Sequence, residues 1–314
     1  MNTAWKIKEA IKRNPAARFL IEERKRREYQ KLAQTVSDRD FIEALYEKRI
    51  GRKPDLDHPV TYTEKLQWLK LHYRDPAIPR ASDKYEAKNY IAERGFPELL
   101  IPTLAVYDSA EEIDPDALPA QFIIKATHGS GWNFICRDKR SFHLSAKRKI
   151  MNTWLHENLY IYGREWNYKE QTPRLIVEPL MDTKPLVDYK FLCFNGVCRA
   201  MQVNHDEAGT HYVDYYDGDW NPYPDMSSGT ADISGEALPK PEKFEEMKAI
   251  AEQLAAPFPF VRVDLYLIRG RIYFGEMTFF PGSGFWKITP EKYDRMFGAW
   301  LEIPNAATVG DSHD

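Results

Sequence analysis

The sequence predicts an α+β protein whose strands are grouped in hairpins, with helices between them. The segment FVRVDLYLIRGRIYFGEMT places two apolar runs around a tight turn at Arg269-Gly270. The segment DYKFLCFNGVCRAMQV, residues 188–203, predicts a second hairpin that turns at Asn195-Gly196. Paired hairpins favour antiparallel sheets over a doubly wound parallel sheet, in which single strands alternate with helices.

Residues 1 to about 80 are predicted to be helical. The segment 4–34 has apolar residues at helical spacing, interrupted at Asn14-Pro15. SDRDFIEALYEKRIGRKP begins with a candidate N-cap and reaches a glycine, which predicts a short helix. TYTEKLQWLKLHYRDP repeats this pattern: Thr63 precedes Glu64 and an apolar stripe, and Pro76 ends the helix.

The first of these helices is rich in basic residues, with Arg24, Lys25, Arg26 and Arg27 in succession. Such a run is typical of a solvated helix face. The alternative is an anchor on anionic lipid or a docking helix for a membrane-bound assembly. The sequence leaves both interpretations open.

The middle of the chain changes to an alternation of strands and helices. A helix is predicted from Ser82 until Gly95 stops it, and a second over residues 145–160. Strands are predicted in LIPTLAVYD, LPAQFIIKATHGSG, WNFICRD and RLIVEPLMD, of which the second runs into a glycine loop.

The C-terminal part contains the two hairpins. The region 205–240 is rich in Asp, Gly, Pro, Ser and Tyr and is predicted to be an irregular loop or lid over the acceptor. PEKFEEMKAIAEQLAA is an amphipathic helix, and residues 305–314 are expected to be frayed. We therefore expect a helical region at 1–80 and a catalytic domain at 81–304, with subdomains at about 81–180 and 181–304.

Composition places the chain among soluble globular proteins. It has 314 residues, a formal charge of -3, 43% hydrophobic and 29% charged residues. Charge so near neutrality gives no reason to expect a nucleic-acid partner. The three cysteines lack CxxC spacing, which argues against a disulfide framework or zinc site and favours a reducing cytoplasm. No secretory signal is recognised, and no apolar run reaches the roughly 18 to 20 residues that span a bilayer.

Two carboxylates in the last hairpin are the strongest chemical signal. Asp264 and Glu276 can lie side by side at one end of an otherwise apolar sheet, where burial is costly unless a cation compensates it. Hard oxygen ligands on a rigid scaffold suit Mg²⁺, which in proteins usually accompanies nucleotide phosphates. Arg262 and Asp264 share a face, as do Asp188 and Lys190. Asp188 and Lys190 could form an ordinary surface ion pair, or Lys190 could face phosphate or substrate.

A second signal is Lys125 at the end of a strand, directly before a glycine loop. Gly129 and Gly131 let the backbone approach anionic oxygens closely, although the P-loop pattern GxxxxGK[ST] is absent. An ordinary turn, capped by His128, is an equal alternative. In RLIVEPLMD, Glu178 could accept from an adenine amine and Asp182 could reach a ribose hydroxyl.

The order of these motifs resembles the ATP-grasp superfamily over residues 80 to 290. The matching parts are Asp83-Lys84 at a helix start, FIIK before the glycine loop, IVEPLMD, and RVD followed by GEMT. The segments TYTEKLQWLKL, DKYEAKNYI, LIP, KATHGSG and DYKFLCFNG are closer still to the TupA-like branch, which is associated with teichuronopeptide and other cell-surface polysaccharides.

The resemblance implies an ATP-grasp fold and a role for each matching residue. It assigns Lys84 and Lys125 to the ATP phosphates, with a closing loop formed by His128, Gly129, Ser130 and Gly131. It assigns Glu178 and Leu180 to adenine. Asp264 and Glu276 would bind Mg²⁺, and Arg262 would steady the reaction intermediate. Thr278 stands where many relatives carry Asn, so it would be a weaker ligand for a second metal ion.

The function implied is an ATP- and Mg²⁺-dependent carboxylate–amine ligase that joins an amino acid or peptide to an acidic sugar through an acylphosphate. The first alternative is a sugar phosphotransferase, with Asp188 or His205 as base. The second is a glycosyltransferase, for which Asp217-Gly218-Asp219 fits a DxD spelling, although such a sequence is more often a turn.

Overall fold

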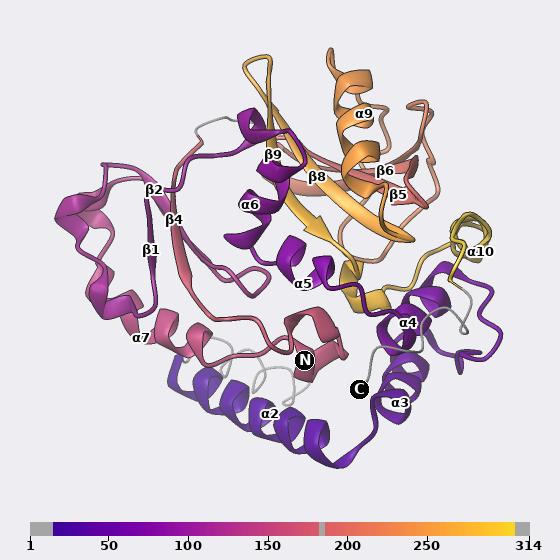
Figure 1. Ribbon diagram of the computed structural model, residues 1–314, viewed down its shortest axis with the longest axis horizontal. Helices are drawn as coiled ribbons and strands as arrows, with labels where there is room; N and C mark the ends of the chain where they lie inside the picture. Colours follow the sequence, from indigo (N-terminus) through magenta and orange to yellow (C-terminus); the bar gives the residue numbers. More distant parts are fainter. Residues whose placement is uncertain (1–14, 182–185, 305–314) are drawn as a thin grey trace, which may run out of the picture.

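The computed structural model describes residues 15–181 and 186–304, with side chains described from residue 23 onward. Expectations that concern residues 1–14, Asp182 and residues 305–314 lie outside the described residues. Within the described residues, helices precede and separate strands that form two antiparallel sheets, which confirms the α+β prediction (Figure 1).

The first sheet has four short strands in the order β1-β4-β2-β3. Its strands are β1 (Ala105–Tyr107), β2 (Phe122–Ala126), β3 (Asn133–Cys136) and β4 (Leu175–Pro179). Helix α7 (Leu144–Leu155) packs on β2 through Met151, and a separate apolar core gathers there around Phe122, Ile124 and Val177. Strand β2 alternates buried and half-buried residues, so Ile123 and Lys125 point away from this core.

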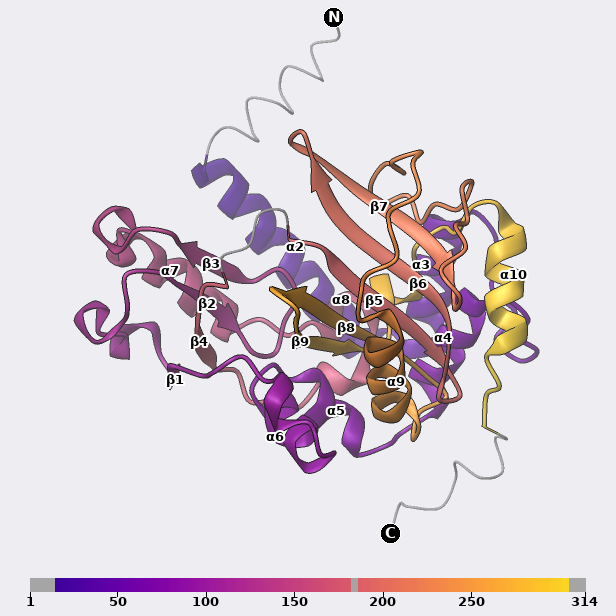
Figure 2. The same cartoon turned by 90° about the horizontal axis from the view of Figure 1, so that it is seen from above.

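The second sheet has five strands in the order β7-β6-β5-β8-β9. They are β5 (Asp188–Phe194), β6 (Val197–Glu207), β7 (Thr210–Asp217), β8 (Phe260–Ile268) and β9 (Arg271–Thr278). Helix α9 (Phe244–Ala255) covers the face that carries Phe191 and Val263 (Figure 2). The opposite face carries Lys190, Asp264 and Glu276, because these residues are direct register partners across β5, β8 and β9.

Both predicted hairpins are present, with their turns at Asn195-Gly196 and Arg269-Gly270. The prediction of an irregular loop over 205–240 is wrong in its first part. Strand β6 continues to Glu207, and β7 pairs with it along its whole length. The segment THYVDYYD alternates its side chains between two faces, a strand signal that the surrounding Gly and Asp residues concealed.

The N-terminal region is helical as predicted. Its helices are α2 (Pro15–Thr35), α3 (Asp38–Ile50), α4 (Tyr62–His72), α5 (Ala77–Ser82) and α6 (Glu86–Glu93). Helix α3 has Ser37 as N-cap and ends at Gly51 in the left-handed conformation. Helix α4 starts at Tyr62, two residues earlier than the Thr63-Glu64 pattern suggested, because Thr61 is the N-cap and forms a reciprocal capping box with Glu64.

Helix α4 is joined to the end of the chain. Thr63 donates from its backbone N–H to Asp294 Oδ1 at 2.9 Å and from its hydroxyl to Oδ2 at 2.7 Å. Asp294 belongs to α10 (Glu291–Trp300), a helix that the sequence analysis did not identify. At Gly298 a Cβ would lie 2.1 Å from the Val60 carbonyl oxygen, so glycine permits the close approach of α10.

Helix α4 also holds the turn that follows β9. Gln67 donates to Gly284 O at 2.8 Å, and Lys70 donates to Ser283 O at 2.9 Å and to Gly163 O at 2.6 Å. Ser283 and its two glycine neighbours all have positive φ, which is costly for a serine. These buried hydrogen bonds therefore fix a strained turn just beyond the cleft end of β9.

The remaining elements are short connections. They are α8 (Tyr160–Gly163) and the 3₁₀ turns η1 (Pro97–Leu99), η2 (Ala110–Glu112), η3 (Pro115–Ala117), η4 (Lys139–Ser141), η5 (Trp166–Tyr168) and η6 (Pro281–Gly284). No helix within the described residues is both long and apolar enough to cross a lipid bilayer.

Candidate functional site

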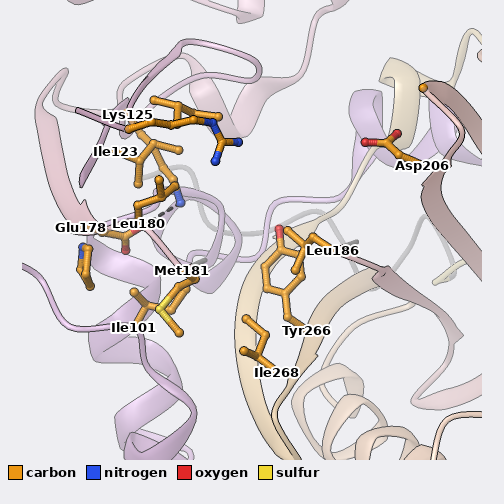
Figure 3. A pocket seen from close by; sticks show the side chains of 14 residues that line it. Ile101, Ile123, Lys125, Glu178, Leu180, Met181, Leu186, Asp206, Tyr266 and Ile268 are labelled. Carbon is orange, nitrogen blue, oxygen red and sulfur yellow. Dashed lines mark hydrogen bonds and ion pairs between the residues drawn. The ribbon is translucent and has the colours of Figure 1, made fainter. Parts of the chain in front are cut away.

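A cavity of about 730 Å³ lies between the two sheets (Figure 3). The first sheet and the segment after β4 contribute Ile123, Lys125, Glu178, Leu180 and Met181, among others. The second sheet contributes Tyr266 and Ile268 from β8, which face the aliphatic residues across the gap. Apolar walls with a few polar groups are typical of a pocket for a flat organic ligand.

A second cavity of about 250 Å³ adjoins the first and shares Lys125, Glu178 and Tyr266 with it. Its lining adds Lys84 and Gly131 from one side and Glu276 from the other. The two cavities therefore form one cleft that changes from an apolar slot to a charged end. The charged end is where the predicted phosphate-binding and metal-binding residues meet.

Lysines cluster around Glu178 on the first wall. Lys125 Nζ lies 2.7 Å from Glu178 Oε2, and Lys88 Nζ lies 2.5 Å from Oε1. Burial raises the pKa of Glu178, but the two lysines outweigh burial and the pKa is lowered. Both oxygens of Glu178 accept from lysines here, so this carboxylate positions cations rather than presenting a vacant acceptor to adenine.

Lys84 stands at the base of the glycine loop and donates to the carbonyl of Gly129. Burial lowers its pKa, and the carboxylate of Glu276 opposes this effect from the opposite wall. Three lysines of this wall, Lys84, Lys88 and Lys125, line the charged cavity together with a single carboxylate of the same wall, Glu178. The first wall is thus prepared for a negatively charged ligand.

The glycine loop is shaped by Trp132. A Cβ on Gly129 would lie 2.0 Å from the Trp132 ring, so only glycine fits beneath it. Gly131 lines the charged cavity and has φ of +72°. His128 is 3% exposed and its Nε2 lies 2.9 Å from the Trp154 carbonyl oxygen, so it ties the loop to α7 and does not line either cavity. Ser130 is exposed.

Arg262 organises the second wall. Its guanidinium donates to both oxygens of Asp264 at 2.7 Å, to Glu276 Oε1 at 3.0 Å and to Thr278 Oγ1 at 3.1 Å. Thr278 in turn donates to Glu276 Oε1 at 3.0 Å. The two carboxylates are therefore side by side, as the hairpin register predicted. The register shifts by one residue at Gly275, where glycine permits the close approach of the strands because a Cβ would lie 3.0 Å from the Asp264 carbonyl oxygen.

Lys190 and Asp188 extend this network along β5. Lys190 contacts Asp264 directly and lies 2.5 Å from Asp188 Oδ2. Asp188 Oδ1 is buried and has no hydrogen-bond partner among the residues that the structure describes. Burial and the nearby charge of Asp264 raise the pKa of Asp188, while Lys190 opposes them.

Charges from both walls act on Glu276. Burial raises its pKa, but Lys84, Arg262 and Lys190 outweigh burial and lower it to about 2. Lys84 belongs to the first wall and the other two to the second, so the carboxylate is ionised between two cationic surfaces. Of the residues predicted as phosphate and metal ligands, Lys84, Lys125, Gly131 and Glu276 line this end of the cleft.

The donor set fits a divalent cation at Glu276 better than at Asp264. Glu276 lines the cavity, and among described residues only its Oε1 takes part in a hydrogen bond. Both oxygens of Asp264 are occupied by Arg262 and Lys190, and the residue is 1% exposed. Within 15–181 and 186–304, no three His, Cys, Asp or Glu side chains gather as a metal site. The metal assignment therefore stays a prediction.

The residues predicted for the two alternative functions, His205 and Asp217-Gly218-Asp219, lie outside the cleft or form an ordinary turn. His205 lies three residues after Gln202, the partner of Lys190, so its side chain is on the opposite face from the cleft. It is 2.8 Å from Asp214 Oδ2. Asp217 Oδ1 accepts from the backbone N–H groups of Asp219 and Asn221, so Asp217-Gly218-Asp219 is a turn after β7.

Sequence reasoning missed Lys88, Tyr266 and the aliphatic slot. Lys88 lies four residues after Lys84, the spacing that places two side chains on one helix face, and this could have drawn attention to it. Tyr266 lies two residues after Asp264 on β8 and lines both cavities. The aliphatic residues carry no local signal, since any strand contains them.

The chain matches one protein-family model. The family model described as TupA-like ATPgrasp matches residues 64–302. No curated protein matches the sequence.

Solved structures also resemble the chain. D-alanine–D-alanine ligase from Bacillus anthracis is 13% identical with a TM-score of 0.39, covering 63% of this chain and 57% of its own. The Helicobacter pylori ligase is 12% identical with a TM-score of 0.42, covering 77% and 67%. N5-carboxyaminoimidazole synthetase from Staphylococcus aureus, complexed with ADP, is 14% identical with a TM-score of 0.35, covering 63% and 43%. The chain thus spans only about half of the first and third of these proteins.

The family model covers more than half of the chain and includes every predicted site residue from Lys84 to Thr278. Its range begins within α4 and ends just beyond α10, so it contains both sheets and the cleft between them. By this match the chain belongs to the TupA-like ATP-grasp family.

Proposed function

We propose that the protein is an ATP-dependent carboxylate–amine ligase. The observation that carries this proposal is the cleft itself, in which Lys84 and Lys125 face Glu276 across a cavity that continues into an apolar slot. The charged end suits the triphosphate of ATP, and the apolar slot suits its adenine ring. Membership of an ATP-grasp family supports the same reading.

The residues present suit carboxylate activation. An oxygen of the acid substrate attacks the γ-phosphorus of ATP, the bond to the ADP oxygen breaks, and an acylphosphate forms. Lys84 and Lys125 neutralise charge on the phosphoryl oxygens. The amine then attacks the acyl carbon, loses a proton, and phosphate leaves. Arg262, fixed by Asp264, faces the oxyanion of this second step.

Mg²⁺ would be held by Glu276, with Asp264 and Thr278 as the further predicted ligands, and would neutralise phosphate charge when bound. Asp264 fits a second role equally well, because it fixes Arg262 and Lys190 in place. For the nucleotide itself, Leu180 and Met181 line the slot, and Asp188 lies close to Tyr266 across β5 and β8.

The proposal also extends to the acid and the amine that the ligase joins. We propose an acidic sugar of a cell-surface polysaccharide as the acid, and an amino acid or short peptide as the amine. The support for these substrates is the family resemblance. The reaction is placed in the cytoplasm, where ATP is available, and nucleic acid is not expected as a partner.

A screen for ADP release tests the proposal. Uronic acids, amino acids and their pairs are offered with Mg²⁺-ATP, and products are separated. Free phosphate together with an amide supports the ligase. A phosphorylated sugar without free phosphate would instead favour the phosphotransferase, for which Asp188 is the candidate base. Release of UDP from UDP-sugars, without any release of ADP from ATP, would overturn both.

A further inference from the structure

The ion-pair cluster on the first wall of the cleft contains two lysines and one carboxylate. Lys125 of β2 and Glu178 of β4 are diagonal neighbours on adjacent strands, since Ile123, two residues before Lys125, is the register partner of Glu178. Figure 3 shows both side chains at this wall. Lys88 reaches the same carboxylate from helix α6. Glu178 is only 5% exposed, so the three groups form one largely buried charge system beside the cavity.

The ammonium of Lys88 is fully engaged within the part of the chain that the structure describes. Its Nζ donates to the Ile101 carbonyl oxygen at 2.7 Å and to Thr103 Oγ1 at 2.8 Å, and it lies 2.5 Å from Glu178 Oε1. An ammonium has three hydrogens, so these three acceptors use all of them. Lys88 lines the charged cavity, but it could bind a phosphate oxygen only by giving up one of these bonds.

Lys125 is in the opposite situation. Its Nζ lies 2.7 Å from Glu178 Oε2, which is its one hydrogen-bond partner among residues 15–181 and 186–304. Its side chain is 26% exposed, compared with 13% for Lys88. Two N–H groups of Lys125 are therefore left for a ligand in the cavity. Of the two lysines on Glu178, Lys125 is the one that can meet a phosphate oxygen.

Charge balance within the cluster decides how strongly Lys125 attracts an anion. Glu178 gives one oxygen to each lysine, which leaves one positive charge of the three groups uncompensated. Without Lys88, both oxygens of the carboxylate could turn to Lys125 and form a neutral pair with it. Screening by solvent is weak at a buried site, so such a pair would hold Lys125 firmly. Lys125 would then lose both its charge and its free N–H groups.

We propose that Lys88 is a positioning residue for the nucleotide: by holding one oxygen of Glu178, it leaves Lys125 available to the ATP phosphates. The inference rests on the proposed function, because it assumes that the phosphates lie at the charged end of the cleft. Lys88 acts through the shared carboxylate and does not itself contact the ligand. Glu178 is in turn a counter-ion that the two lysines divide between them.

The test measures the dissociation constant of MgADP by calorimetry, with the full chain. The proteins are the wild type, Lys88→Met, Glu178→Gln and the double variant Lys88→Met/Glu178→Gln. Lys88→Met should weaken binding about tenfold or more, because a charge-assisted hydrogen bond to phosphate is lost when Glu178 captures Lys125. The double variant should return to within about threefold of the wild type, because the captured lysine is released.

The double-mutant cycle separates this mechanism from total charge. Glu178→Gln should change binding by about threefold at most in the wild type, where Lys125 is already available, and should improve it about tenfold in the Lys88→Met background. Equal improvement in both backgrounds would reduce the effect to the net charge of the wall and would overturn the inference.

Two further variants address a purely structural role. Lys65→Met is the matched control, because Lys65 Nζ also bonds two carbonyl oxygens, of Gly298 at 2.8 Å and Leu301 at 2.7 Å, away from the cleft. It should leave MgADP binding unchanged. Lys88→Gln keeps a donor for the Ile101 carbonyl but no charge, and should bind as weakly as Lys88→Met. Circular dichroism monitors folding. If Lys88→Met does not fold, Lys88→Gln with and without Glu178→Gln provides the same comparison.

Three results would overturn the inference without touching the ligase proposal. Unchanged binding in Lys88→Met would exclude a role in nucleotide binding. A loss that Glu178→Gln does not repair would assign Lys88 to direct phosphate contact or to support of the fold. Wild-type affinity in Lys88→Gln would make the bond to Ile101 the cause. ADP release with amide formation tests the ligase separately. If the wild type does not bind MgADP, the proposed function fails together with this inference.

Discussion

At the scale of single residues, the site is a balance of buried charges. Arg262 is 6% exposed; burial lowers its pKa, but Asp264 and Glu276 outweigh burial and raise it. Removing one member of such a network leaves its partners uncompensated, which costs more than the pair contributes. Each substitution is therefore expected to act through the groups it leaves behind.

Asp264→Asn and Glu276→Gln should each reduce ATP turnover by about a hundredfold or more, the scale seen when an electrostatic group is lost from an active site. Asp264→Asn frees Arg262 and Lys190, and Glu276→Gln removes the predicted cation ligand. Asp219→Asn is the control, because this exposed aspartate belongs to the turn after β7. ADP release and circular dichroism are measured together. Full activity of either site variant would refute its assignment.

Lys125→Ala should raise the KM for ATP at least about tenfold with a smaller change in kcat, since it removes a cation that binds phosphate in every state of the reaction. Steady-state kinetics over a range of ATP concentrations measure this. Lys139→Ala provides a comparison, because that lysine bonds the Leu118 carbonyl away from the cleft. An unchanged KM in Lys125→Ala would place the triphosphate elsewhere.

The sequence identified these residues because each has a local signature: a lysine before glycines, or carboxylates at hairpin-paired positions. It could not reveal that Glu178 holds Lys88 and Lys125, since those partners come from α6 and β2. The same limit applies to His128, whose contact with Trp154 depends on how α7 packs against the glycine loop.

At the scale of elements, the N-terminal helices serve the cleft indirectly. Glu64 in α4 is 3% exposed and accepts from Thr61 N at 3.0 Å as well as from Arg52. Burial raises its pKa, but Arg52 and backbone N–H groups outweigh burial and lower it from 4.5 to about 2. A lowered pKa stabilises the fold above pH 4.5, and that stability disappears as the pH falls through about 2.

Glu64→Gln should therefore lower the free energy of unfolding by about 1–3 kcal/mol at pH 7. The difference from wild type should shrink as the pH is lowered from 4.5 towards 2, because the wild-type carboxylate then becomes protonated. Urea denaturation at several pH values measures it. Glu43→Gln, which alters a surface ion pair with Arg39, should change the free energy of unfolding by no more than about 0.5 kcal/mol. A difference independent of pH would contradict the electrostatic explanation.

Element prediction succeeded where patterns were local and failed where they were not. Both hairpins and α3 followed from turn and cap residues. Strand β7 was missed because polar residues dominate it, although Tyr215 and Tyr216 are buried by the neighbouring layers. Helix α10 was missed because it depends on contacts with distant residues. Asp294 accepts from Thr63 of α4, and Gly298 permits a close approach to Val60.

At the scale of the whole molecule, the basic residues of helix α2 concern association with a membrane. Arg24, Lys25 and Arg27 of α2 are exposed, whereas Arg26 turns towards Glu23 and Glu157. A row of exposed cations on an outer helix suits attraction to anionic lipid headgroups, which supports peripheral association with the inner face of the membrane as a proposal.

The triple variant Arg24→Glu, Lys25→Glu, Arg27→Glu should release the full-length protein from vesicles that contain anionic lipid, in a co-sedimentation assay at low salt. Arg269→Glu, Lys287→Glu, Arg295→Glu changes the same total charge at exposed positions outside α2 and should leave binding unchanged. Equal vesicle binding by wild type and both triple variants would remove the anchoring proposal.

By itself the sequence determined the α+β class, the hairpin that pairs Asp264 with Glu276, and the family, because turn chemistry and strand alternation act over a few residues. Only the tertiary structure decided that Lys84 faces Glu276 and that α4 braces the turn after β9. These contacts join segments up to about two hundred residues apart. Their free energy comes from burial and charge pairing between elements, which no local pattern encodes.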